Sequence, residues 1–224
     1  MMYKLSITHW RSGRYGAGLI ALPALVACGQ VTSGPAVSEQ RTVESFHAIE
    51  MRGAATIDAL VGPAQSISLT AARETLAALD ASVKNGTLIL EQRKRGFWMM
   101  KHGNLQIRIT APTLDAVAIN GAGDVSINGL TGGELSLAVQ GASDLEASGK
   151  VDTLNASING AGDMDLSRLV ATTATVAVNG AGDLTVNVTG TLNAEVNGVG
   201  SIDYLGHPAT VVPAIHGVGS ISPK

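Results

Sequence analysis

The sequence has 224 residues, of which 45% are hydrophobic and 15% charged, so most of the chain is expected to fold around an apolar core. Its formal net charge is −3. Loss of an N-terminal segment that carries three of the 15 basic residues leaves 12 against 18 acids, or −6, which excludes nucleic acid as a partner. The single cysteine excludes internal disulfides and zinc sites made of several thiolates.

The N-terminal residues 1–27 are typical of an export signal. Residues 1–18 contain three bases and no acid, and a short apolar run then ends in Leu25-Val26-Ala27-Cys28. This pattern resembles a bacterial lipoprotein signal peptide, which implies acylation of Cys28 and cleavage before it. The alternative is a plain secretory signal in which Cys28 has no role. We expect residues 28–42 to form a flexible tether, and we expect the protein in the cell envelope, anchored by lipid to the outer membrane and facing either side of it.

A pentapeptide recurs through the C-terminal half of the chain and is the main signal in the sequence. Its first glycine recurs at intervals of 18 to 20 residues, which is typical of a repeat architecture. The six copies are Asn120-Gly-Ala-Gly-Asp124, Gln140-Gly-Ala-Ser-Asp144, Asn159-Gly-Ala-Gly-Asp163, Asn179-Gly-Ala-Gly-Asp183, Asn197-Gly-Val-Gly-Ser201 and His216-Gly-Val-Gly-Ser220.

Apolar and polar residues alternate on both sides of every copy. Val117, Ile119 and Val125, for example, flank the first copy. This period predicts a strand, a glycine corner and a second strand in each repeat, although a hairpin array would also alternate. Because copies about 19 residues apart superimpose in register, we expect residues 111–224 to form an all-β, parallel β-helix-like solenoid with coils of about 19–20 residues.

A weaker version of the pattern extends over residues 43–110, which complete a single domain of residues 43–224. Here we predict a degenerate repeat at 47–58, strands at 65–70 and 87–91, a short helix at 73–81 and a tight turn at Asn85-Gly86. We expect this N-terminal β region to cap the end of the solenoid, because a bare end exposes apolar core and unpaired backbone.

Several ordered motifs together resemble the head GIN domain family, whose members are described as auto-transporter adhesins of unknown function. The motifs are the repeated NGAGD elements, Asn85-Gly-Thr-Leu-Ile-Leu90, Ile107-Arg-Ile-Thr-Ala-Pro112-Thr-Leu and Gly200-Ser-Ile-Asp-Tyr204-Leu-Gly-His-Pro208. The resemblance covers residue 43 to the C-terminus and implies a right-handed parallel β-helix-like fold on an exported, often lipid-anchored protein. It implies no catalytic residues. Gln140, Ser143 and His216 depart from the repeat.

Two columns of polar side chains follow from stacked repeats. Asp124, Asp144, Asp163 and Asp183 would lie about 4.8 Å apart, and such a column is a candidate calcium site because Ca²⁺ prefers carboxylate oxygens. The alternative, which we favour, is that each aspartate accepts hydrogen bonds from its own glycine corner and is otherwise solvated. Stacked asparagines are expected to form a structural amide ladder that Gln140 interrupts, and its members are Asn120, Asn159, Asn179 and Asn197.

The segment from Arg93 to His102 combines cations with aromatic residues. It is either a loop that contacts a membrane or an anionic ligand, or a cover for the open end of the solenoid. Its candidate contact residues are Arg93, Lys94, Arg95, Phe97, Trp98 and Lys101. The repeat half, residues 109–224, carries three cations and eleven acids, so a glycan ligand would have to be neutral, bridged by cations or bound at this loop.

No known catalytic motif occurs in the chain. The sequence lacks a Gly-x-Ser-x-Gly elbow, a His-Glu-x-x-His pair and a phosphate loop, and its histidines are scattered. We therefore expect a protein that is not an enzyme and needs no cofactor, and that binds an envelope component or an extracellular ligand as an adhesin-like or scaffolding surface. The alternatives are a carbohydrate-active β-helix enzyme and an envelope-stress accessory that binds protein partners. The sequence leaves the oligomeric state open.

Overall fold

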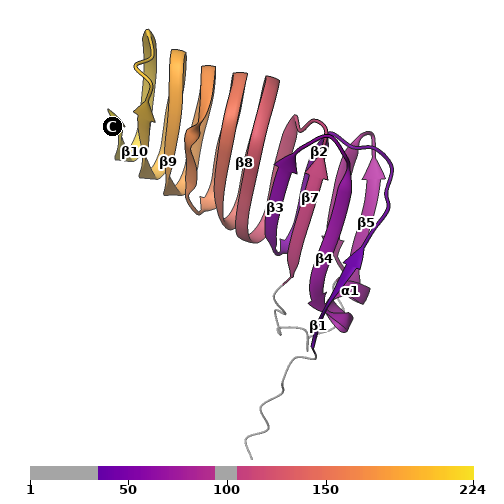
Figure 1. The fold of residues 1–224 in the computed structure, drawn as a ribbon. Coiled ribbons are helices and arrows are strands. Elements are labelled where there is room, and N and C mark those ends of the chain that lie inside the picture. Colours follow the sequence, from indigo (N-terminus) through magenta and orange to yellow (C-terminus); the bar gives the residue numbers. More distant parts are fainter. Residues whose placement is uncertain (1–34, 94–104) are drawn as a thin grey trace, which may run out of the picture. The chain divides into compact units, whose positions relative to one another are not determined.

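Strands dominate the computed structural model, which describes residues 35–93 and 105–224 (Figure 1). This confirms the all-β class. The elements in chain order are β1 (Ala36–Gln40), β2 (Ala48–Ala54), β3 (Thr56–Val61), β4 (Ser66–Ala72), α1 (Arg73–Ala78), β5 (Leu79–Lys84), β6 (Thr87–Gln92), β7 (Gln106–Ala111), β8 (Ala116–Ala161), β9 (Met164–Leu205) and β10 (Thr210–Pro223). Among the described residues, no helix is long and apolar enough to cross a membrane.

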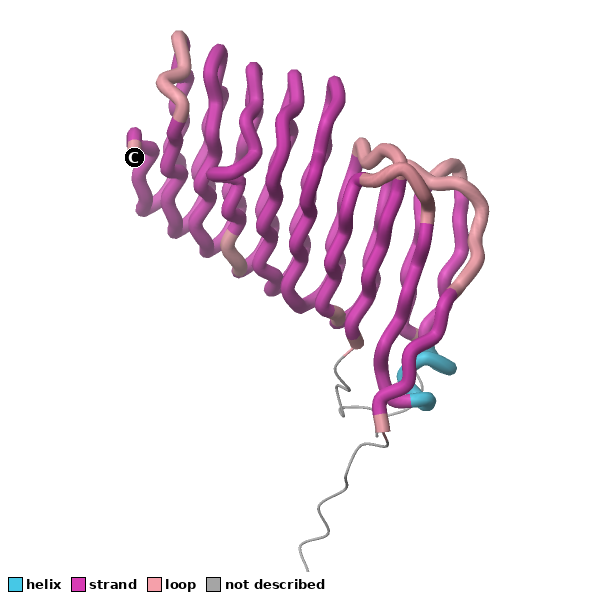
Figure 2. Tube along the Cα trace, viewed as in Figure 1, coloured by secondary structure: helices cyan, strands magenta, loops and turns pink. Residues whose placement is uncertain are grey.

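All ten strands belong to one curled sheet, which the trace in Figure 2 follows from end to end. Its order is β1-β4-β7-β3-β8-β2-β6-β5, and β9 joins β8 to β10. The repeat strands pair in parallel, β8 with β9 and β9 with β10. Antiparallel pairing is confined to the N-terminal part, where β4 pairs with β1 and β7, and β5 pairs with β6.

The repeats stand in register with one another. Gly160 pairs with Gly180 across β8 and β9, and Gly198 pairs with Gly217 across β9 and β10. The predicted degenerate repeat follows the same rule, since Gly53 of β2 pairs with Gly121 of β8. Each long strand therefore passes alongside its own earlier repeats, and equivalent positions of the pentapeptide form columns.

Each repeat has two strand segments that meet at the glycine corner, as the folded ribbons of Figure 1 show. Alternate side chains of both segments point inward. Val176, Val178 and Leu184, on either side of one corner, are almost completely buried. Burying such a side chain contributes about 1.5–3 kcal/mol, and the narrow interior explains why small aliphatic residues make up the core.

The N-terminal region contains the predicted elements with shifted boundaries: β4 covers 66–72 rather than 65–70, and β6 ends at 92 rather than 91. The helix α1 ends at Ala78 rather than at residue 81, because Leu79 begins the strand β5 that pairs with β6. The turn at Asn85-Gly86 joins these two strands, as predicted. Residues 36–40, within the segment expected as a tether, form β1. The Arg41 guanidinium that follows β1 donates to the carbonyls of Leu76 and Leu79 at the end of α1 (2.8 and 2.7 Å).

Candidate functional site

Most residues of the two N-terminal candidate sites lie outside the described residues. These are the lipid attachment residue Cys28 and, in the basic loop, Lys94, Arg95, Phe97, Trp98 and Lys101. Arg93, at the start of the loop, is described. Its backbone N–H donates to the Ala78 carbonyl (2.9 Å), and its guanidinium lies 3.2 Å from the Asp80 carboxylate. The basic loop therefore remains a sequence prediction.

The aspartate column lies along the exposed corners of the repeats, where its carboxylates connect successive repeats. The backbone N–H of Asp163 donates to Oδ1 of Asp144 (3.0 Å), and that of Asp183 donates to Oδ1 of Asp163 (2.9 Å). Ser201 continues the pattern, because both its N–H and its hydroxyl donate to Oδ1 of Asp183 (2.9 and 2.7 Å). Asp124 is exposed at the first corner. The expectation that each aspartate bonds its own glycine corner is therefore wrong for Asp144, Asp163 and Asp183, which accept hydrogen bonds from the next repeat.

These hydrogen bonds bear on the calcium hypothesis. In Asp144, Asp163 and Asp183 one carboxylate oxygen is already used to hold a backbone N–H of the neighbouring repeat. Within the described part of the chain, no group of three or more histidine, cysteine, aspartate or glutamate side chains is arranged to hold a metal ion. The geometry therefore gives Asp144, Asp163 and Asp183 a structural role, which is to fix the register of the corners.

The predicted amide ladder is confirmed across three repeats. Nδ2 of Asn179 donates to Oδ1 of Asn159 (3.0 Å), and Nδ2 of Asn197 donates to Oδ1 of Asn179 (2.8 Å). Asn120, on the other side of Gln140, instead donates to the Glu50 carboxylate of β2 (3.2 Å). The amide ladder and the aspartate hydrogen bonds flank the glycine corners, so the successive corners from Gly141 to Gly198 are joined by side chains as well as by backbone.

One outer face of the stack is uncharged at two outward-facing positions over four repeats. It is formed by the strand segments that precede the corners, where these two positions hold small side chains or an amide; the Glu134 carboxylate lies beside it and accepts from Nδ2 of Asn155 (3.1 Å). We call this surface the neutral face. The third residue before the first glycine is Ala118, Ala138, Ser157 or Ala177, and the fifth is Ala116, Ser136, Asn155 or Thr175.

The outer face formed by the strand segments after the corners is charged. Glu146, Asp165 and Asp203 occupy its equivalent outward-facing position, the fifth residue after the first glycine. Glu146 accepts from the Arg168 guanidinium (2.7 Å). The side-chain and backbone hydrogen bonds from Ser167 hold the pKa of Asp165 below its ordinary value. The two faces of the stack therefore differ in charge.

The last repeat, in β10, exposes apolar side chains that the sequence analysis did not single out. Val212, Ile215 and Val218 are 53%, 44% and 75% exposed, and Val199 of the preceding repeat is 61% exposed. The signal in the sequence was the change of the pentapeptide from Asn-Gly-Ala-Gly-Asp to a form with valine and serine. This change replaces the aspartate by serine and the alanine by the larger valine at the corners of Gly198 and Gly217.

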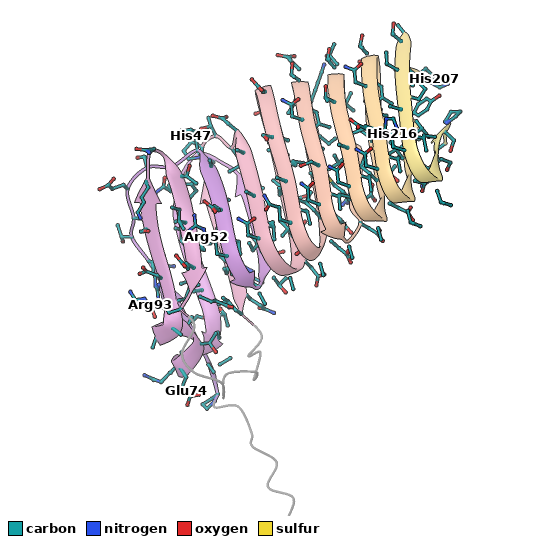
Figure 3. All side chains as sticks on the ribbon, turned by 180° about the vertical axis from the view of Figure 1, so that it is seen from behind. His47, Arg52, Glu74, Arg93, His207 and His216 are labelled. Atoms are coloured by element: carbon teal, nitrogen blue, oxygen red, sulfur yellow. The ribbon has the colours of Figure 1, made fainter. Side chains whose placement is uncertain are left out.

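The histidines are spread along the stack rather than gathered. Figure 3 shows His47 among the N-terminal strands and His207 and His216 at the opposite end. Nδ1 of His47 lies 3.2 Å from the Asp115 carboxylate, an exposed pair. The geometry thus brings no two of these three histidines together.

Comparison with known proteins gives one family. The family model described as "Putative auto-transporter adhesin, head GIN domain" matches residues 45–208. No curated protein sequence matches the chain.

Three solved structures are similar. A putative adhesin of Bacteroides fragilis NCTC 9343 is 25% identical with a TM-score of 0.68, over 86% of this chain and 98% of that one. A putative adhesin of Parabacteroides merdae ATCC 43184 is 18% identical, with a TM-score of 0.52, over 86% and 97%. A putative lipid binding protein of Parabacteroides distasonis ATCC 8503 is 19% identical, with a TM-score of 0.50, over 85% and 97%. The last two show a shared fold.

Proposed function

The chain belongs to the head GIN domain family, and we propose that it is a non-catalytic envelope protein, exported and anchored through Cys28, that acts as an adhesin-like binding surface. The family match and the similarity to the Bacteroides fragilis adhesin support a role in surface binding. In this proposal the stacked repeats form a right-handed parallel β-helix-like solenoid. The in-register parallel pairing of β8, β9 and β10 supports that arrangement.

The observation that carries the proposal is the neutral face. Stacking in register turns a short sequence repeat into a surface on which the same outward positions recur at the strand spacing of about 4.8 Å. Asn179 uses one N–H and one oxygen lone pair in the ladder and keeps the others for a ligand, and Asn159 is used there only as an acceptor. A surface of small and amide side chains fits an uncharged, hydroxyl-rich ligand, and we assign neutral glycans as the ligand class.

Two arginine substitutions on opposite faces of one repeat test the binding surface. Ala177 lies on the neutral face and Thr185 on the charged face, and both are half-buried and outward-facing. The test measures binding of the full chain and of the Ala177→Arg and Thr185→Arg variants to an array of neutral and acidic glycans. We expect neutral glycans to bind the full chain and Thr185→Arg, and binding to fall at least tenfold in Ala177→Arg. Equal binding by the two variants would contradict the assignment.

The anchor is tested separately, because a lipid-free protein can keep its binding surface. We expect the full chain produced in a bacterial host to incorporate a radiolabelled fatty acid and to sediment with membranes. The Cys28→Ser variant should incorporate none. Labelling that persists in this variant would contradict acylation at Cys28, the chain's only cysteine.

A further inference from the structure

The last repeat differs from all others in its charge. Its register with β9 places Ala214 opposite Glu195 and Ser222 opposite Asp203, so both outward-facing acids of the preceding repeat are replaced by small uncharged residues. Residues 204–224 contain no aspartate or glutamate at all. The end of an otherwise acidic stack is therefore free of acidic side chains, and a second surface of the same kind can approach it without repulsion between carboxylate side chains.

The same repeat leaves core-type residues uncovered. Ile215 pairs with Val196, which is 0% exposed, yet Ile215 itself is 44% exposed because no strand among the described residues pairs with the other edge of β10. Val218 continues the outward corner position of Val199 and is 75% exposed. An edge strand that is meant to remain free usually carries charges, whereas β10 has His216 as its one titratable side chain.

The sequence of β10 is also nearly palindromic about Val218. Reading outward from Val218, both directions give glycine at the first position, isoleucine at the third and proline at the fifth. The intervening pairs are His216 with Ser220 and Ala214 with Ser222. In an isologous two-fold interface residue i meets residue j while j meets i, so a palindromic strand presents matching residues to a second copy of itself.

The backbone nitrogens that face the free edge of β10 are arranged with the same two-fold symmetry about Val218. The N–H of Lys224 donates to the Tyr204 carbonyl of β9 (2.9 Å), so the nitrogen of Pro223 faces the free edge, because successive residues of a strand point to alternate sides. Ser136 stands five residues before its glycine, as Val212 does, and its N–H donates to the preceding repeat (2.8 Å). By this equivalence the nitrogen of Pro213 also faces the free edge.

Between the two prolines the edge can still pair. Leu145 and Gly162 hold the repeat positions of Ile221 and Gly219, and their N–H groups donate to the following repeat (2.9 and 3.3 Å). Ile221 and Gly219 therefore direct their N–H groups to the free edge. Ile215, two residues from Pro213, does the same by alternation.

We propose that the chain forms a two-fold symmetric dimer through β10, in which the two strands pair antiparallel about Val218. In this dimer Ile215 of one copy pairs with Ile221 of the other copy, and the two cores become continuous. Pro213 lies opposite Pro223 of the other copy, where neither supplies an N–H, so the ladder ends at both sides. Val218 meets Val218 of the other copy on the axis.

Pairing of β10 with the N-terminal end of another copy is disfavoured. The outer strands there, β1 and β5, carry Glu39, Asp80 and Lys84, and Arg93 is paired with Asp80 next to them. Both β1 and β5 run antiparallel to the strands they pair with, and neither has a palindromic sequence. A dimer closed by a two-fold axis also uses up the apolar edge, whereas head-to-tail pairing would leave one edge free and produce filaments.

The first test is the mass of the full chain in a nonionic detergent, measured by sedimentation equilibrium. We expect twice the mass of a single copy, which is 22.8 kDa for all 224 residues and less once residues 1–27 are removed. The Val218→Asp variant places two carboxylates on the axis and should lose the dimer, while Ala161→Asp, at the same exposed corner position of an inner repeat, should keep it. Equal thermal midpoints for these two variants would show that the loss is not caused by unfolding.

Disulfide formation provides a second test that does not disrupt the surface. In the full chain with Cys28→Ser, which has no other cysteine, Val218→Cys should form a disulfide-linked dimer under mild oxidation at least tenfold faster than Ala161→Cys. A monomer at every concentration together with equal oxidation rates would overturn the proposal. Pro213 and Pro223 would then serve to prevent pairing at a free edge. Filaments would overturn it in favour of head-to-tail pairing. A monomer that binds phosphatidylcholine vesicles through Val218 would overturn it in favour of a lipid surface.

Discussion

Alanine at the glycine corners should destabilise the fold for two separable reasons, and Gly180→Ala combines them. Gly180 has a φ of +138°, which side-chain-bearing residues rarely adopt, and a Cβ there would collide with the Gly160 carbonyl of the preceding repeat. Backbone strain of this kind costs about 1–3 kcal/mol, and overpacking costs about 1–3 kcal/mol more. We expect a loss of about 2–6 kcal/mol from a total stability of about 5–15 kcal/mol.

Three further glycines allow the two causes to be measured apart. Gly162→Ala meets the Ser143 carbonyl but has no unusual φ, so it tests crowding alone. Gly132→Ala has a φ of +152° with nothing within 4 Å, so it tests backbone strain alone. Gly133→Ala has neither feature and is the matched control, for which we expect a change within about 0.5 kcal/mol.

Urea unfolding of the four variants, followed by circular dichroism, measures these differences. We expect Gly180→Ala to lose the most stability, Gly162→Ala and Gly132→Ala to lose intermediate amounts, and Gly133→Ala to match the parent. If Gly162→Ala were as stable as Gly133→Ala, the close approach of successive corners would be refuted. A denaturation slope that differs among the variants would indicate a change in the unfolded or folded state rather than in stability alone.

Removing the carboxylate in Asp183→Ala should cost about 1–2 kcal/mol, because Ser201 loses the acceptor for its N–H and hydroxyl, and urea unfolding against Ser201→Ala measures how much of the loss belongs to the hydroxyl. Asp165 has a lowered pKa in the folded protein, so its carboxylate stabilises the fold at pH values above its ordinary pKa of 3.8, and this stabilisation is lost as the pH falls through the lowered pKa. Asp165→Asn should therefore reduce the pH dependence of the unfolding free energy below about pH 4. The reduction should be under about 1 kcal/mol, because the group is exposed. Calcium and chelator should give equal thermal midpoints, because the aspartate column bonds the backbone of successive repeats; a calcium-dependent rise that disappears when all four aspartates become asparagine would contradict this structural role.

The sequence was most informative where the repeat is regular. Period-two alternation and the spacing of the glycines predicted strands in register, and the asparagine ladder followed from that register, because identical residues in stacked strands meet their own kind. The same logic located the degenerate copy at Gly53, which pairs with Gly121. Local turn chemistry was sufficient at Asn85-Gly86.

The parts that were missed depend on neighbours distant in the sequence. The acceptor role of Asp163 toward Asp183 required the offset between successive corners, which periodicity alone does not specify. The end of α1 at Ala78 was set by pairing of Leu79 with β6, a tertiary contact that overrides helix propensity. Val212 and Val218 are exposed because β10 is an edge strand of the sheet, and valine by itself is an ordinary strand residue that does not indicate an edge.

The central claim is that the neutral face, rather than the charged face on the other side of the stack, contacts the ligand. The most direct measurement is photo-crosslinking in living cells that produce the full chain with a benzophenone amino acid at position 177 or, as the control, at position 185 of the same repeat. The account predicts glycan-bearing crosslinked products from position 177 and not from position 185. Products of equal yield from both positions, or products from position 185 alone, would contradict it.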